Sequence, residues 1–271
     1  MTLDTRPRDL GLFGPDSVTW RIHQDPCMLI GGMRALLVQA LHPLAMAAMD
    51  QRSGWRNDPW GRLRRTSEFV TITIYGESDA ARAAGARVRA IHRRISGVDS
   101  VTGRPYRADD PELLLWIHCV EVDSFLAAYR RYGGRLSAPD ADRYVDEMRR
   151  AGALVGLEAR DMPRSVAELD AYLTGVKGLC VTPGAREGLR LVLSPPVSLP
   201  TRVAWVVPAS AAIAILPQQA RELYGLPWFE PAGPAVRLAA IALCKAMRAV
   251  LPPPPTLRDA LERARLLPGA A

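Results

Sequence analysis

Residues 111–132, PELLLWIHCVEVDSFLAAYRRY, decide the fold. An aspartate and a proline make a strong helix start at the beginning of this stretch, and two glycines follow its end. Apolar residues occupy every face of the predicted helix, so we expect other helices to surround it. The stretch nonetheless carries His118, Glu121 and Asp123. Buried ionisable side chains need partners or ligands, which makes this helix a candidate wall of a functional site.

Helical periodicity and capping residues extend in both directions from this stretch. They predict further helices near residues 17–24, 25–50, 62–75, 78–95, 138–150, 165–181, 183–193, 200–216, 218–224, 233–251 and 256–266. Residues 97–110 are expected to form a loop. The sequence therefore predicts an all-α fold in a single domain over residues 1–271, with residues 1–24 as an N-terminal leader and residues 252–271 as a C-terminal tail helix.

Two local features are open to interpretation. His42-Pro43 interrupts the helix predicted near residues 25–50, and a proline there should bend or break it. Earlier in the same helix, Gly31-Gly32 would allow another element or a flat ligand to approach its backbone. Residues 70–75, VTITIY, alternate like a strand but also continue a helical pattern. We favour the helix because no partner strand is evident in the sequence.

Composition excludes several classes of protein. A hydrophobic content of 48% excludes a disordered chain, and 271 residues suffice for a sizeable core. The net charge of +7 comes almost entirely from arginine. Three explanations are open: codon usage in a high-GC genome, an anionic ligand, or an acidic membrane surface. No nucleic-acid-binding motif accompanies that charge, so we expect no nucleic-acid partner.

The four cysteines are far apart and suggest neither a zinc site nor a disulfide framework. Free thiols are typical of a reducing cytoplasm, which is the expected location. Two apolar segments, residues 28–49 and 203–216, are candidates for membrane spans. The first contains charged and polar residues and a proline, and the second is shorter than the roughly 20 residues that a span needs. Both favour buried helices, while peripheral membrane contact stays open.

His92 is the residue in this sequence best placed to hold a haem iron. It shares an apolar stripe with Ala84, Val88, Ile91 and Ile95, and arginines cover the other side of the same predicted helix. A haem iron needs a neutral imidazole facing an apolar slot, and haem propionates need cationic partners. A histidine on an apolar stripe is also compatible with a purely structural role in the core.

Other chemistries have weaker support. His118 and Glu121 have the i, i+3 spacing of di-iron carboxylate bundles, but such bundles need a second pair, which is missing. The sequence has no zinc-hydrolase motif, no serine-hydrolase elbow and no glycine-rich nucleotide loop.

Several short motifs, taken together in order and spacing, resemble the MpaB-type oxygenases, a family that includes the latex clearing proteins, or rubber oxygenases. The resemblance runs from about residue 29 to residue 251. It rests on ALLVQALHP at residues 35–43, RLRRT at 62–66, VRAIH at 88–92, GRPY at 103–106, LLWIH at 114–118 and LYGL at 223–226.

The resemblance implies an all-α fold with a globin-like core and a haem b whose proximal iron ligand corresponds to His92. It also implies a distal helix that contributes Arg62, Arg65 and Thr66 as catalytic residues. A helical wheel independently places Arg62 and Thr66 on one face. His118 is the second candidate for the iron ligand. His42 would line the distal side or bind a propionate, or else have a structural role at the bend.

Two departures from the family limit what the resemblance implies. Arg65 stands where rubber oxygenases have a lysine, and a guanidinium does not lose its proton to ligate iron, so a propionate or substrate contact is the better expectation. The acidic residue that rubber oxygenases use as a base has no match near Met46, so rubber cleavage is not expected.

The function predicted from the sequence is that of a haem b-dependent oxygenase. It would use O2 and an electron donor to oxidise a hydrophobic or prenylated small molecule, or to cleave its double bond, while Arg62 and Thr66 stabilise developing negative charge. Two alternatives stay open: a haem-binding carrier or sensor without turnover, and a non-haem helical lipid-binding protein.

Overall fold

The computed structural model describes residues 9–52, 54–226 and 233–265. In these residues the fold is all-α, as predicted. The helices are α1 (Val18–His23), α2 (Met28–Gln39), α3 (Pro43–Arg52), α4 (Pro59–Tyr75), α5 (Ser78–His92), α6 (Pro111–Ala128), α7 (Ala138–Val155), α8 (Val166–Gly175), α9 (Pro183–Leu193), α10 (Leu199–Ala214), α11 (Gln218–Tyr224), α12 (Gly233–Val250) and α13 (Pro255–Arg265). A π-helical turn (Tyr129–Gly133) extends α6, and a short 3₁₀ turn (Ala159–Asp161) follows α7.

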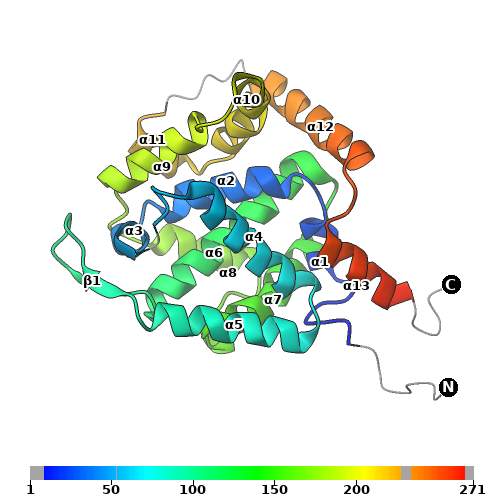
Figure 1. Ribbon diagram of the computed structural model, residues 1–271, viewed down its shortest axis with the longest axis horizontal. Helices are drawn as coiled ribbons and strands as arrows, with labels where there is room; N and C mark the ends of the chain where they lie inside the picture. The colour runs from blue at the N-terminus through cyan, green and yellow to red at the C-terminus, as the bar shows by residue number, and fades with distance from the viewer. Residues whose placement is uncertain (1–8, 53, 227–232, 266–271) are drawn as a thin grey trace.

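Helix α6 runs through the middle of the molecule (Figure 1). Its buried side chains point in all directions, so the prediction of a central helix surrounded by others is confirmed. Its most extensive packing is against α2, and α7, α8, α1 and α3 also contact it. Asp110 begins α6 by accepting a hydrogen bond from the backbone N–H of Glu112, as the aspartate-proline signal indicated.

A buried ion pair joins α2 to α6. Arg34 contacts the Asp123 carboxylate at 2.7 Å and donates to the Ser124 hydroxyl at 2.6 Å. It also donates to the carbonyl of Ile215, just beyond α10, at 2.8 Å. Asp123 thus has the partner that a carboxylate on a buried helix requires, and α2, α6 and α10 are tied together at one point.

The helix predicted near residues 25–50 breaks at the proline, as expected: α2 and α3 meet at 105°. Gly31 of α2 lets α6 approach, because a Cβ atom there would lie 2.8 Å from Phe125. No single described helix has both the length and the apolar character to cross a bilayer. Two bent helix pairs have them in combination: α2 with residues 43–50 of α3, and α10 with α11.

The segment with strand-like alternation, residues 70–75, is helical and completes α4. The expected loop at residues 97–110 is wrong in part, because β1 (Ser96–Val98) and β2 (Pro105–Arg107) form an antiparallel hairpin. Its turn is stabilised locally: the Asp99 carboxylate accepts hydrogen bonds from the N–H groups of Val101 and Thr102, and Gly103 adopts a φ of 69°.

The ends of α5, α7 and α8 also differ from the prediction, and α7 continues to Val155 rather than ending near residue 150. Helix α8 ends at Gly175 rather than near residue 181, because the following chain is extended and the N–H of Cys180 bonds the carbonyl of Leu41. Helix α5 ends at His92 rather than at Ile95. At the two ends of the chain, α1 and α13 both pack against α4. Trp20 of α1 donates to the carbonyl of Ile74, so this part of the leader belongs to the core.

Candidate functional site

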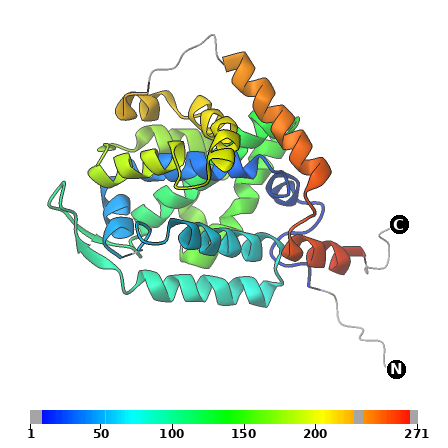
Figure 2. The ribbon, with the colours of Figure 1, turned by 45° about the horizontal axis from the view of Figure 1, so that its top comes forward.

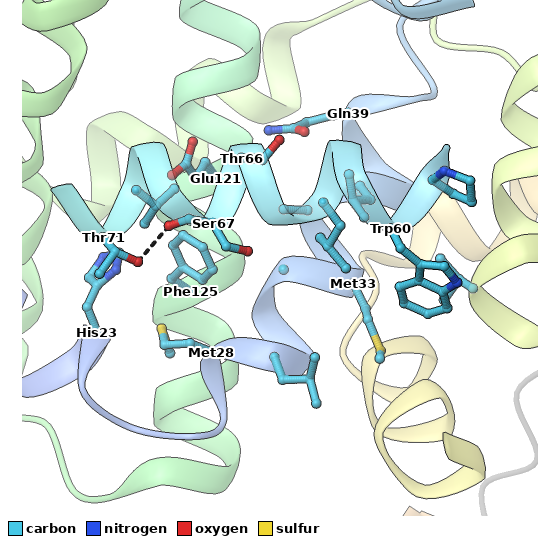
Figure 3. A pocket seen from close by; sticks show the side chains of 18 of the residues that line it. His23, Met28, Met33, Gln39, Trp60, Thr66, Ser67, Thr71, Glu121 and Phe125 are labelled. Carbon is cyan, nitrogen blue, oxygen red and sulfur yellow. Dashed lines mark hydrogen bonds between the residues drawn. The ribbon is translucent and has the colours of Figure 1, made fainter. Parts of the chain in front are cut away.

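An apolar cavity of about 350 Å³ lies between α2, α4 and α6, with α9, α10 and the end of α1 completing its wall (Figure 3). This volume is typical of small-molecule sites. Three of the large hydrophobic side chains that remain exposed in the fold, Leu29, Leu36 and Trp60, line this cavity. They are therefore exposed to a binding space rather than scattered over the surface.

The cavity contains a few polar groups on its apolar wall. Those of helices α1, α2, α4 and α6 include His23, Gln39, Thr66, Ser67, Thr71, Tyr75 and Glu121. Glu121 forms no hydrogen bond or ion pair with another described residue, and burial raises the pKa of its carboxyl to about 7. Among the described residues, this carboxyl is thus the polar group of the cavity with the most unused hydrogen-bonding capacity.

His23 and Tyr75 lie at the same end of the cavity. The His23 ring contacts Phe125, one helical turn beyond Glu121, and its Nε2 lies 3.1 Å from the hydroxyl of Tyr144. Burial lowers the pKa of His23 to about 3, so this histidine is neutral. Tyr75 is buried, and its hydroxyl has no hydrogen-bond partner among the described residues.

Helix α4 carries the three residues that were predicted as catalytic. Thr66 lines the cavity, and its hydroxyl donates to the carbonyl of Arg62 at 3.1 Å. Arg62 is largely desolvated, which lowers its pKa, and it forms no ion pair with a described carboxylate. Arg65 instead lies at the surface with Asp58, 3.5 Å away. Arg65 therefore differs from Arg62 in having a carboxylate partner, although its charge is near enough to lower the pKa of Arg62.

His92 is the last residue of α5, and this helix lies on the side of α4 opposite to α9 and α10 (Figure 2). Burial lowers the pKa of its imidazole, and the nearby Arg62 guanidinium lowers it further, while Asp109 acts in the opposite direction. Its Nδ1 is buried without a hydrogen-bond partner among the described residues. The Arg62 guanidinium is therefore near enough to His92 to act on it electrostatically. The apolar stripe beside His92 is only partly covered, since Ile91 is 52% exposed.

The other two candidate ligands lie elsewhere. His42 accepts a hydrogen bond from the N–H of Ala45 at 3.4 Å, in the first turn of α3, and its ring faces Trp116. This contact is compatible with the structural role at the bend. His118 is buried against Gly152 of α7, with its ring atoms 3.2 Å from where a Cβ atom there would lie. Burial lowers the pKa of His118 to about 4.

Residues 20–249 match the family described as "ER-bound oxygenase mpaB/B'/Rubber oxygenase, catalytic domain". The chain belongs to the mpaB/rubber oxygenase family. Comparisons with curated proteins and with solved structures give no match. Membership of this family makes the chain an oxygenase-type protein, and the match spans all the helices from α2 to α11 and nearly all of α12.

For a member of this oxygenase family, the residues around His92 suit a haem. A neutral imidazole with a buried, unpartnered nitrogen is an appropriate iron donor, and Arg62 is a cation without a described carboxylate partner, as a propionate requires. No group of three or more His, Cys, Asp or Glu side chains in the described residues could hold a metal ion without such a cofactor. These two side chains thus have the donor chemistry of a haem site, although His92 is not among the residues that line the apolar cavity.

Sequence reasoning missed the polar end of the cavity. His23 gave no functional signal, and Tyr75 belongs to the segment with strand-like alternation. Glu121 gave the one usable signal, a carboxylate on a helix that is apolar all round. What the sequence lacked was the information that α1, α4 and α6 place these three side chains around one cavity.

Proposed function

We propose that this chain is a haem b-dependent oxygenase that oxidises a hydrophobic small molecule with O2. The observation that carries the proposal is the position of α4. Arg62 on this helix lies near His92, whereas Thr66, one turn later, lines the apolar cavity. Helix α4 thus carries one residue near the candidate iron ligand and another on the wall of the candidate substrate site.

Each residue has a role that follows from its surroundings. Haem bound at His92 would supply the activation of O2. His92 is kept neutral by burial and so offers a lone pair. Arg62 would bind a propionate or stabilise negative charge that develops beside it, and its partial desolvation strengthens either interaction. Thr66 would orient the substrate at the cavity wall. The apolar lining, with Leu29, Leu36 and Leu63, excludes water from the substrate.

The absorption spectrum tests the cofactor assignment. Protein produced with haem supplied should show a Soret band, and His92→Ala should lose the band or shift it strongly. His118→Gln and His42→Gln should leave it in place, because these side chains pack against Gly152 and Trp116 respectively. Absence of the band in the parent protein, or its loss in His118→Gln rather than in His92→Ala, would contradict the assignment.

A helical carrier is the second candidate function, and the cavity favours it, since an apolar binding space serves a carrier as well as an enzyme. Oxygen uptake separates the two. With a reductant and a hydrophobic substrate, an oxygenase consumes O2 in proportion to product, and His92→Ala abolishes the uptake. A carrier binds the same compound without consuming O2.

A further inference from the structure

The cavity is elongated and its two ends differ in chemistry. Residues from Pro59 to Tyr75 of α4 line it, and at 1.5 Å rise per residue this corresponds to a length of about 24 Å. Trp60 and Trp205, whose rings meet edge to face, lie at one end. His23 and Thr71 lie at the other (Figure 3). A ligand that fills this space is long and narrow.

The Trp60 end is apolar and open. Trp60 is 40% exposed, and Leu191 and Val192 of α9 line the cavity beside Trp205. Between the two ends, Leu29 and Leu36 of α2 contribute uncovered aliphatic surface. A hydrocarbon chain is the complement of such a wall, because each buried CH₂ gains free energy from leaving water.

The opposite end holds two polar groups without partners among the described residues. One is the Glu121 carboxyl, and the other is the buried Tyr75 hydroxyl. Figure 3 shows Glu121 in the half of the cavity that His23 occupies. Buried polar groups are nearly always hydrogen-bonded in folded proteins, so a ligand group that satisfies them is expected at this end. Because Glu121 accepts and Tyr75 donates, the best complement is a group that does both.

We propose that the cavity binds a long-chain alcohol, with its hydroxyl at Glu121 and Tyr75 and its hydrocarbon chain directed toward Trp60. This proposal rests on the proposed function in one respect: it takes this cavity as the substrate site. It narrows the substrate class from hydrophobic small molecules to chains that end in a hydroxyl.

The charges around Glu121 favour an alcohol over an acid. Among the described residues, no arginine or lysine lines the cavity to receive a carboxylate. The titratable groups near Glu121 are His23 of α1, Tyr75 of α4 and Tyr144 of α7, and burial keeps all three neutral: it lowers the pKa of His23 to about 3 and raises the pKa of both tyrosines. A carboxylate ligand would therefore meet the Glu121 carboxylate without a neutralising cation.

The sign of the pH effect follows from the raised pKa of Glu121, about 7. Below that value the carboxyl is protonated and tolerates an acid ligand. Above it the carboxylate repels one, whereas a hydroxyl donates to either form. Discrimination between an alcohol and an acid should thus increase as the pH rises through the pKa of Glu121.

The experiment is displacement of the neutral dye Nile red from the full chain by decanol and by decanoate. Near pH 8 decanol should compete at least about tenfold more strongly, and near pH 6 the difference should shrink. In Glu121→Gln, a nearly isosteric change, decanoate should gain affinity and the pH dependence should disappear. Val70→Trp, which fills the cavity wall, should abolish dye binding while circular dichroism stays helical.

Equal competition by both compounds near pH 8, or unchanged discrimination in Glu121→Gln, would overturn the proposal. So would dye binding that survives Val70→Trp, or stronger binding of decylamine than of decanol, which would indicate a cation site. Neither dye binding nor competition requires haem. Loss of the Soret assignment with retained alcohol selectivity would refute the proposed function alone, and the reverse result would refute this proposal alone.

Discussion

At the scale of single residues, the buried Arg34 gives the sharpest prediction for stability. Its side chain is 5% exposed and pairs with Asp123 at 2.7 Å. Arg34→Met should lower the free energy of unfolding by about 3–5 kcal/mol, because it leaves the Asp123 carboxylate and the Ser124 hydroxyl without their partner. Urea denaturation followed by circular dichroism measures the change.

The matched control for this residue is Arg64→Met. Arg64 and Glu68 form an exposed ion pair on α4, with 3.8 Å between their charged atoms. Its removal should change the stability by no more than about 0.5 kcal/mol. If the two variants were equally stable, the ion pair between α2 and α6 would not have the structural role described above.

The same scale shows what a sequence can predict about a site. His92 was predicted from an apolar stripe and a family resemblance, and Arg62 from the same resemblance and a helical wheel. The Arg62 guanidinium is near enough to lower the pKa of His92, while the roles of both residues stay predictions. Arg65 belongs to the same motif but lies at the surface, since helical spacing does not determine which edge of a face is covered. Tyr75 and His23 could not be predicted, because their unpaired or neutral state depends on helices distant in sequence.

At the scale of elements, the contact between α2 and α6 depends on one glycine of a pair. A Cβ atom on Gly31 would lie 2.8 Å from the Phe125 ring and 3.2 Å from the carbonyl of Ser124. Gly31→Ala should therefore destabilise the protein by about 1–3 kcal/mol through overpacking. It should also weaken dye binding, since it displaces the helix that carries Glu121.

Gly32 is the control within the same helix. A Cβ atom there has no neighbour within 4 Å, so Gly32→Ala should stabilise the helix by about 0.5–1 kcal/mol through its better helix propensity. Thermal denaturation of the two variants gives the comparison. Destabilisation of similar size in both variants would contradict this prediction, because only Gly31 is packed against α6.

Element types were predictable from local signals, and each of the two exceptions has its own physical cause. Proline and capping residues correctly placed the α2–α3 break and the start of α6. The β1–β2 hairpin was missed because its turn is stabilised by Asp99, whose side chain bonds backbone three residues away without any strand-like run. The end of α8 was missed because the chain after it is held extended. The N–H of Cys180 donates a hydrogen bond to the carbonyl of Leu41, which lies just beyond α2.

At the scale of the whole molecule, an exposed apolar face lies next to the cavity. Leu199, Val203 and Val206 of α10 are exposed and share one side of the helix, while Trp205 lines the cavity. Residues 188–221 contain three arginines and no acidic residue. An apolar helix face with neighbouring cations and no anions has the composition of a surface that contacts acidic lipids.

This arrangement predicts association with membranes that contain anionic lipid. The protein should sediment with vesicles of mixed neutral and anionic phospholipid, and less with purely neutral vesicles or at high salt, because salt screens the arginines. Val203→Glu combined with Val206→Glu should reduce the bound fraction several-fold, about one decade per 1.4 kcal/mol of binding energy lost.

Val101→Glu is the matched control: it places the same charge on an exposed valine of the hairpin, away from α10. An equal loss of bound fraction in the control would indicate a general effect of added charge. Equal binding to neutral and anionic vesicles would show that the arginines do not contribute to binding. Reduced binding in the α10 variant alone would place the membrane next to the open end of the cavity, where a hydrophobic substrate could enter directly from the bilayer.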